Sequence, residues 1–230
     1  LEQQAMQSST SKPVKAALEA VPGVGSKVRR DHSVPKPPDY DLHILRNVDL
    51  RQVFAYINPT MLYGKHLGLR GTFEHLLASG DEKAAKLKGQ VEALQNEIIA
   101  QGLMQANAIY RFYSCQSRGE DLIIYDPEDQ RRVIETFTFP RQPSGERLCL
   151  SDYSRDLASG EMDAVAIFVV SCGKGIRELS ETWKGAGEYL RCHLLQAIAI
   201  EGVEALAEWL HKKIRADWGF ADSPEMTVRD

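Results

Sequence analysis

The sequence lacks long apolar runs, paired cysteine motifs and a surplus of positive charge. A membrane-spanning helix needs about 20 consecutive apolar residues, and no stretch of the 230 residues approaches that length. The net charge is −4, whereas nucleic-acid-binding domains usually carry a basic surplus. We therefore expect neither a membrane nor a nucleic acid among the partners.

Other absences concern location and chemistry. The first residues show no cationic stretch followed by an apolar one, so a secretory signal is not indicated. The four cysteines are scattered without Cys-x-x-Cys spacing, which is typical of free and mostly buried thiols. Hydrophobic residues make up 43% and charged residues 26% of the chain, which is ordinary for a globular protein. These features predict a cytoplasmic location.

The N-terminal part differs in composition from the rest. Residues 1–38 are rich in Ser, Lys, Pro and Gly, and the prolines of residues 35–38 favour extended backbone. This segment is predicted to be a linker, in which a short helix over residues 14–20 would be marginal. A single ordered domain is predicted over residues 39–230.

The clearest structural pattern lies between residues 108 and 142. Three short runs of β-branched and aromatic residues are separated by tetrapeptides that contain Gly or Pro, which is typical of an antiparallel strand meander. Further along, residues 163–170 are almost continuously apolar. Such a run favours a central strand that is covered on both faces.

Helical patterns flank the strands. Apolar residues at helical spacing over residues 50–57 predict a helix with Asp49 as its N-cap. That helix is expected to end at Asn58, because a residue that precedes a proline is pushed out of the helical region. Helix termination is therefore the simplest role for Asn58.

A long helix is predicted behind a capping box formed by Ser79 and Glu82. Its apolar stripe runs over residues 87–98 with alternating spacings of four and three. Residues 177–217 predict one or two further helices, interrupted near residues 185–187. Helices, then an antiparallel sheet, then helices indicate an α+β fold.

The last long helix carries a polar group of side chains on one face. Glu201, Glu204, Glu208 and His211 follow one another at spacings of three, four and three. Glu208 and His211 form a Glu-x-x-His pair of the kind that carboxylate-bridged metal sites use. Such sites need a second pair and further Glu ligands, which the sequence does not offer. A polar helix face, wetted or docked on a partner, is favoured over a metal enzyme.

For two other motifs a structural role is favoured over a chemical one. Residues 171–175, Ser-Cys-Gly-Lys-Gly, stand between a strand and a helix, as a phosphate-binding loop would. The spacing matches neither the Walker nor the Rossmann pattern, so a tight turn is favoured. Cys115 could be a nucleophile, but it lies within a predicted strand and has no assigned His partner. A buried thiol is favoured there.

Several strings together carry a family resemblance. They occupy residues 35–38, 48–58, 121–126, 137–142, 148–153 and 207–215. In their order and spacing over most of the chain, they resemble the activation domain of cobalamin-dependent methionine synthase, a methyltransferase of methionine biosynthesis. The fold that the resemblance implies is a single C-shaped α+β domain with a twisted antiparallel sheet.

The resemblance implies a helper reaction. Domains of this family bind S-adenosylmethionine over cobalamin, which a neighbouring domain of the parent enzyme holds. A flavodoxin-type or reductase partner supplies an electron, and the sulfonium methyl then passes to cobalt, which restores methylcobalamin from inert cob(II)alamin. The protein contributes placement, while the cofactors carry the chemistry.

The resemblance also points to particular residues. Asn58 occupies the position of a residue, often Asp, that contacts the amino-acid end of S-adenosylmethionine. An amide there keeps hydrogen bonding but loses a charge, a difference of about 1 kcal/mol. Glu204 falls where the family has a carboxylate on the cobalamin side of the cleft, and Glu201 lies one turn before it. Arg141 and Gln142 match a family string and are expected to brace the sheet.

One departure from the family pattern bears on activity. The main S-adenosylmethionine motif of the family, Arg-x-x-x-Gly-Tyr-Pro-Ala, would follow the segment that resembles residues 218–230, and the sequence ends at Asp230. The family's last elements are therefore expected to be missing, and the segment alone is expected to be inactive and to bind S-adenosylmethionine very weakly. The alternative is a non-catalytic docking or structural module of the same fold that has lost this binding.

Overall fold

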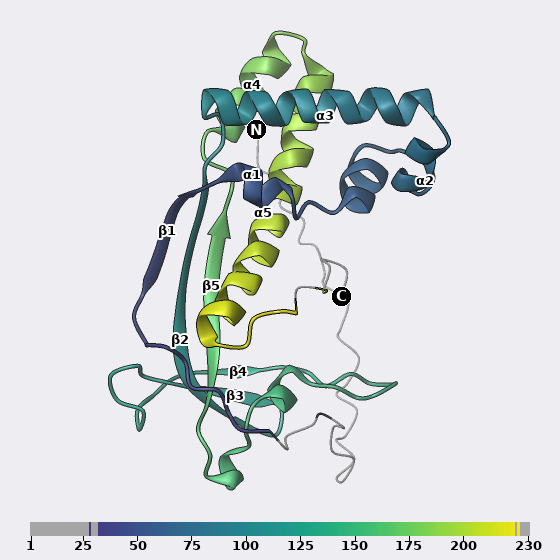
Figure 1. Ribbon diagram of the computed structural model, residues 1–230. Helices are drawn as coiled ribbons and strands as arrows, with labels where there is room; N and C mark the ends of the chain where they lie inside the picture. The colour runs from purple at the N-terminus through teal and green to yellow at the C-terminus, as the bar shows by residue number, and fades with distance from the viewer. Residues whose placement is uncertain (1–27, 29–31, 224, 226–230) are drawn as a thin grey trace, which may run out of the picture.

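The structure, a computed structural model, describes residues 28, 32–223 and 225. Most of the predicted linker, including the possible helix over residues 14–20, lies outside the described residues. The chain forms a C: an upper arm of helices and a lower arm of strands project to the same side from a central column (Figure 1). The column consists of long strands with the last helix packed against them. The predicted α+β class and C-shaped outline are confirmed.

One five-stranded antiparallel sheet connects the two arms. Its strands are β1 (His43–Val48), β2 (Ala106–Arg118), β3 (Asp121–Tyr125), β4 (Val133–Thr138) and β5 (Asp163–Ser171). The 13-residue β2 pairs with β1 through its first residues and with β3 through its last. The predicted meander is therefore confirmed as β2–β3–β4, and β2 is the element that spans from one arm to the other.

The position of β5 differs from the prediction of a central strand covered on both faces. This strand pairs with β2 along its whole length, from Asp163 to Ser171, and has no other strand partner among the described residues. One face packs toward the last helix, where Phe168 meets the ring of His211. The other face is open, and Val169 is 62% exposed. The apolar run thus belongs to an edge strand with one exposed apolar face.

The upper arm begins with α1 (Leu50–Phe54), whose N-cap is Asp49 as predicted; the Asp49 carboxylate accepts a hydrogen bond from the backbone N–H of Arg51. The helix ends at Phe54, earlier than the predicted end at Asn58. A seven-residue π-helix, η1 (Thr60–His66), then follows. The prediction was too long because apolar residues at helical spacing continue past Phe54 into the loop that follows the helix.

The predicted capping box at Ser79 and Glu82 is wrong. Ser79 is the C-cap of α2 (Phe73–Ala78), and its hydroxyl donates to the carbonyl of Leu76. Asp81 caps the long helix α3 (Glu82–Gln101) instead, with its carboxylate accepting from the N–H of Ala84 at 2.7 Å. Two short-range signals compete here, and the carboxylate of Asp81, next to the helix, caps it in preference to the hydroxyl of Ser79 two residues earlier.

Two helices complete the fold, as predicted: α4 (Ile176–Gly185) and α5 (Tyr189–Trp218). The chain reverses between them at Gly187, where φ is 81°. The 30-residue α5 packs against the upper-arm helices and against β2 and β5, with Leu195, Ile198 and Leu206 fully buried. It therefore joins the upper core to the column. Within the described residues, no helix is both long and apolar enough to cross a membrane.

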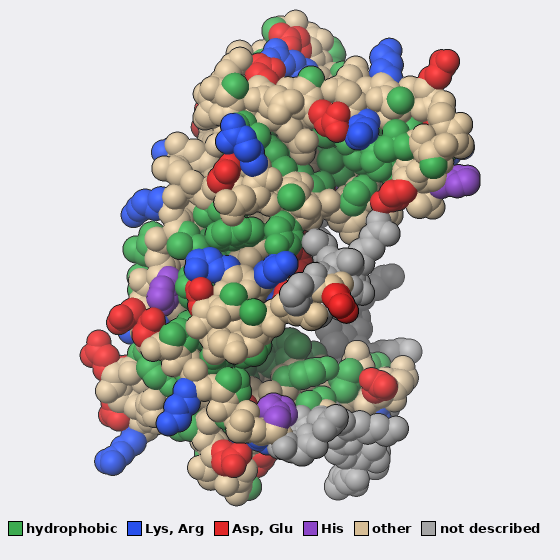
Figure 2. Space-filling view, viewed as in Figure 1, with side chains coloured by type: hydrophobic (Ala, Val, Ile, Leu, Met, Phe, Trp, Pro, Cys, Tyr) green, Lys and Arg blue, Asp and Glu red, His purple; other side chains and the backbone are tan. Residues whose placement is uncertain are grey.

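The hydrophobic core consists of three clusters, one each in the upper arm, the column and the lower arm. The largest cluster of buried side chains lies between α3, α5 and the upper-arm helices, a second lies between β2 and the end of α5, and a small one lies in the lower arm. Figure 2 shows the mouth of the C between the arms, with hydrophobic side chains on the inner side of the lower arm. All four cysteines are free and buried, as predicted.

Candidate functional site

A hollow of about 390 Å³ lies between η1 and the middle of α5, in the inner corner of the C where the upper arm meets the column. This volume is at the small end of the usual range for ligand pockets. Its lining consists of Tyr56, Asn58, Met61, Lys65, His66, Ile200, Glu201, Glu204, Ala205 and Glu208. The structure thus brings together Asn58, Glu201 and Glu204, the three residues for which the family resemblance implied a place in the ligand cleft.

Asn58 stands at the start of η1 rather than at the end of α1. Its side-chain oxygen accepts hydrogen bonds from the backbone N–H groups of Thr60 at 2.9 Å and Met61 at 3.3 Å. These are two of the N–H groups that the first turn of a helix leaves without a partner. The residue is exposed, and its side-chain N–H₂ makes no hydrogen bond with another described residue. Asn58 therefore caps a helix and can offer the hollow a donor.

The sequence predicted a polar helix face, wetted or docked on a partner, and the structure shows that Glu201 is not in contact with bulk solvent on that face. The residue is 3% exposed, and its Oε1 lies 2.8 Å from Nε2 of His66. The ring of His193 in turn contacts the carbonyl oxygen of His66 at 2.9 Å. These two contacts hold the last turn of η1 against α5. Sequence reasoning missed His66 because no local pattern links residues 135 positions apart.

The other charged side chains of the hollow are open to solvent. Glu204, Glu208 and Lys65 are exposed, and none of them forms an ion pair with another described residue. The hollow therefore holds three carboxylates and one ammonium group, with His66 beside the buried carboxylate. Such a surface attracts a cation, and the ammonium group of Lys65 can pair with a carboxylate on the same ligand.

The metal hypothesis for Glu208 and His211 gains no support from the geometry. The ring of His211 lies edge-on to Phe168, with ring centroids 4.9 Å apart, whereas Glu208 lines the hollow. Within the part of the chain that the structure describes, no group of three or more His, Cys, Asp or Glu side chains is placed to hold a metal ion.

The two remaining motifs have the simpler roles. Residues 171–175 form the turn from β5 into α4, with Gly175 at a φ of 85° as the N-cap. Cys115 is fully buried in β2, and burial raises the pKa of its thiol to about 12. A thiol that stays protonated at neutral pH is a poor nucleophile.

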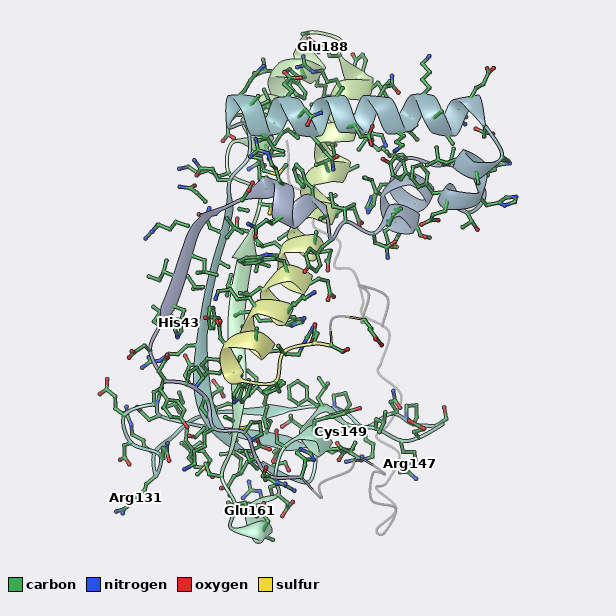
Figure 3. All side chains as sticks on the ribbon, in the orientation of Figure 1. His43, Arg131, Arg147, Cys149, Glu161 and Glu188 are labelled. Atoms are coloured by element: carbon green, nitrogen blue, oxygen red, sulfur yellow. The ribbon has the colours of Figure 1, made fainter. Side chains whose placement is uncertain are left out.

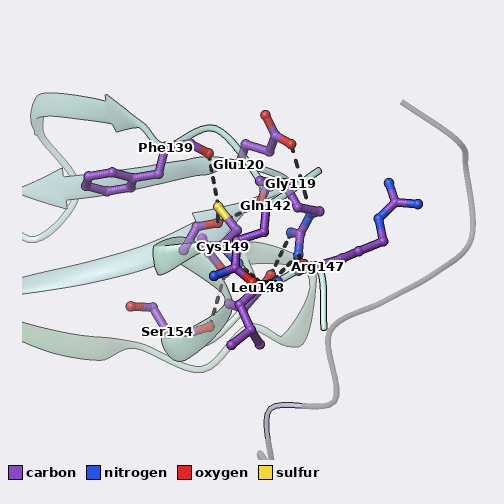
Figure 4. Close-up of polar contacts among 12 residues, drawn as sticks. Gly119, Glu120, Phe139, Gln142, Arg147, Leu148, Cys149 and Ser154 are labelled. Carbon is purple, nitrogen blue, oxygen red and sulfur yellow. Dashed lines mark hydrogen bonds and ion pairs between the residues drawn. The ribbon is translucent and has the colours of Figure 1, made fainter. Parts of the chain in front are cut away.

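Arg141 and Gln142 lie in the lower arm and brace it (Figure 4). The Arg141 guanidinium donates to both carboxylate oxygens of Asp152, at 2.6 and 2.7 Å, and to the carbonyl of Arg147. Gln142 exchanges hydrogen bonds with the backbone of Leu148. Figure 3 shows how far this corner, marked by Cys149 and Arg147, lies from the upper arm, where Glu188 is labelled.

Comparisons with known proteins agree with this fold. A sequence model of the family described as "Vitamin B12 dependent methionine synthase, activation domain" matches residues 49–230. The chain is 27% identical over 217 residues to a methionine synthase of Mycobacterium tuberculosis (strain ATCC 25618 / H37Rv), which covers 89% of this chain and 18% of that protein. It is also 27% identical over 218 residues to a methionine synthase of Mycobacterium leprae (strain TN), covering 87% of this chain and 17% of that protein.

A solved structure has the same architecture. The crystal structure of the MetH reactivation domain bound to AdoHcy superposes with a TM-score of 0.76 and 19% sequence identity, covering 86% of this chain and 62% of that chain. At this identity the likeness establishes the fold alone. The chain spans less than a fifth of the length of the two curated relatives, at 18% and 17%.

Proposed function

This chain belongs to the family of activation domains of vitamin B12-dependent methionine synthase, and we propose that it serves a methionine synthase by presenting S-adenosylmethionine to oxidised cobalamin. The observation that carries the proposal is the hollow in the inner corner of the C. Asn58 and Glu204, which are 146 positions apart by residue number (204 − 58), both line it. They do so in a fold shared with a reactivation domain that binds AdoHcy.

Cobalamin is a substrate of this module in the proposed scheme, held by a neighbouring domain. The methyl group leaves the sulfonium of S-adenosylmethionine as a methyl cation equivalent, and the sulfur keeps the electron pair as S-adenosylhomocysteine. A flavodoxin-type or reductase partner supplies one electron to the cobalt. This chain's own part is to fix the ligand in the inner corner, and the buried His66–Glu201 contact supports that part by holding η1 rigidly against α5.

The proposal also implies a cellular location and a division of activity within the parent enzyme. The buried, unpaired cysteines support a reducing, cytoplasmic environment. The activity of the whole enzyme, 5-methyltetrahydrofolate–homocysteine methyl transfer, would belong to other parts of the parent protein. For this chain by itself we propose no catalytic residue.

A second function is a docking or structural module that has lost S-adenosylmethionine binding. It is favoured by one contact: the side-chain oxygen of Asn58 is already occupied by the backbone of η1. In that case the chain would still dock on a cobalamin-binding domain but would supply no methyl donor.

One experiment tests the proposed function against this alternative. Because the segment alone is expected to be inactive, the chain is tested as part of its parent methionine synthase, which is loaded with cob(II)alamin and given a one-electron reductant and methyl-labelled S-adenosylmethionine. We expect the paramagnetic cob(II) signal to decay and labelled methyl to appear on cobalt in a manner that depends on the chain. A decay and label transfer that are the same without the chain would contradict the proposal and favour the docking module.

A further inference from the structure

We propose that a second hollow, on the outer face of the sheet, binds the phosphate group of a small organic phosphate. This outer hollow has a volume of about 400 Å³ and lies at the ends of β1 and β5 that point toward the upper arm (Figure 1). Its lining residues are all polar: Arg46, Asn47, Gln105, Asn107 and Lys174. It shares none of them with the hollow between η1 and α5, so the inference goes beyond the proposed function.

A β-bulge gathers side chains at the outer hollow. The pairing of β1 with β2 shifts register between Leu45 and Val48. As a result, Arg46 and Asn47 of β1 stand opposite the single residue Asn107 of β2. Asn47 has a φ of 53°, which few residues other than glycine adopt, and its backbone N–H donates to Oδ1 of Asn107 at 3.1 Å. The bulge thereby brings two side chains of β1 to the outer hollow, where a regular strand would bring one.

The outer hollow lies on the side of the sheet that faces away from α5. Ala108 of β2 is buried in a cluster with Leu210 of α5, and side chains alternate along a strand, so Asn107 points to the opposite face. Lys174 reaches the same place from the turn that follows β5. Its segment is a turn and not a phosphate-binding loop, and it contributes only the ammonium group. Three separate segments therefore supply the lining.

The two cations of the outer hollow have no partner within the protein. Arg46 and Lys174 are exposed, and neither forms an ion pair with another described residue. No carboxylate lines the outer hollow. Asp49, the acidic residue of the adjoining hollow, pairs with Arg51. Two positive charges match the charge of nearly −2 on a phosphate monoester, whereas a single carboxylate would leave one of them unpaired.

Amide groups add neutral donors beside the cations. Oδ1 of Asn107 already accepts from the N–H of Asn47, so the N–H₂ group of Asn107 is the part that remains to meet a ligand. The side chain of Gln105 makes no hydrogen bond with another described residue, and both amide residues of β2 and its approach are partly buried. Phosphate oxygens accept hydrogen bonds from such donors and from both cations.

An adjoining hollow gives room for the rest of an organic phosphate. It has a volume of about 320 Å³, shares Asn47 and Gln105 with the outer hollow, and is lined in part by the apolar residues Ile98, Ile99 and Met104. A ligand whose phosphate lies among the cations can therefore extend a compact apolar group into this space. The pair of hollows indicates a small phosphate monoester as the class of ligand.

The test is an NMR titration of the isotope-labelled full chain with inorganic phosphate, at an ionic strength kept constant with chloride. We expect a dissociation constant on the order of 1 mM, as a ligand of five heavy atoms allows. The amide shifts should centre on Asn47 and Asn107. Phenyl phosphate should bind about fivefold more tightly than inorganic phosphate, and phenyl sulfate, which has the same shape and less charge, about tenfold more weakly than phenyl phosphate.

Three substitutions test the assigned residues. Arg46→Gln and Lys174→Gln each remove one exposed charge and should weaken phosphate binding by about tenfold. Asn107→Asp keeps the acceptor for the N–H of Asn47 but replaces a donor with a negative oxygen, and should weaken binding by more than about a hundredfold. Lys184→Gln, at the other end of α4 and outside the outer hollow, is the matched control and should bind as the wild type does.

Several results would contradict the phosphate site. They are equal shifts with phosphate and with chloride, unchanged affinity in both Arg46→Gln and Lys174→Gln, or phenyl sulfate binding as tightly as phenyl phosphate. Shifts centred on Asn58 instead of Asn107 would also overturn it. Thermal unfolding followed by circular dichroism checks that each variant is folded. Binding of S-adenosylmethionine should be the same in all of these variants, so the proposed function stands or falls separately.

Discussion

Removal of the Arg141 guanidinium should loosen the lower arm without changing the hollow. Arg141 donates two hydrogen bonds to the carboxylate of Asp152, which is 5% exposed, and one to the carbonyl of Arg147. In Arg141→Met the Asp152 carboxylate stays buried and loses both guanidinium bonds, while the N–H of Cys149 still donates to it at 2.8 Å. Removal of one partner from a buried ion pair costs about 3 to 5 kcal/mol. The lower figure applies because that donor remains and the Arg141 side chain is 19% exposed.

The assay is thermal unfolding followed by circular dichroism, with hydrogen exchange to locate the loss. A cost of about 3 kcal/mol should lower the melting temperature by roughly 6 to 12 °C for a chain of this size. The matched control is Arg177→Met, whose guanidinium is 87% exposed and lies 4.0 Å from Glu181; such surface pairs contribute about 0 to 1 kcal/mol. If both variants lose the same small amount, or if Arg141→Met alters ligand titration at the hollow, the assignment of Arg141 to the scaffold is wrong.

Three further outcomes are expected. Burial raises the pKa of the thiols of Cys115 and Cys172 to about 12 and about 11, so at pH 8 a small alkylating reagent should modify them only after unfolding, as mass spectrometry would show. Burial also raises the pKa of Tyr63 to about 12, so its contribution to stability is complete below pH 10 and is lost as the pH rises toward 12; unfolding of Tyr63→Phe should lack this loss. Asn58→Ala removes the cap of η1 and should cost about 1 kcal/mol in urea unfolding, whereas Asn58→Asp keeps an acceptor there and should cost less.

The sequence predicted those parts of the fold that local patterns control. The meander β2–β3–β4 follows from alternation and turn residues, and the break between α4 and α5 follows from glycine. The exposure of β5 could not be predicted, because an apolar run does not reveal whether a second element covers it. The end of α1 was placed too late because the apolar spacing continues past Phe54 into a loop.

The site was predicted in part for a similar reason. Asn58 and Glu204 came from a family resemblance, and the hollow brings them together. The burial of Glu201 and its contact with His66 depend on how η1 lies on α5, which no short-range pattern encodes. Long-range packing therefore decides which carboxylates of one helix face are open to a ligand and which are buried.

The central claim is that the hollow between η1 and α5 holds S-adenosylmethionine. The most direct measurement is a map of backbone amide shifts as the labelled chain is titrated with this ligand to millimolar concentration. The account predicts that the largest changes fall on Asn58, Met61 and Glu204, which line the hollow, and that the lower arm around Arg141 is unchanged. Changes confined to the lower arm, or no changes at all, would contradict it.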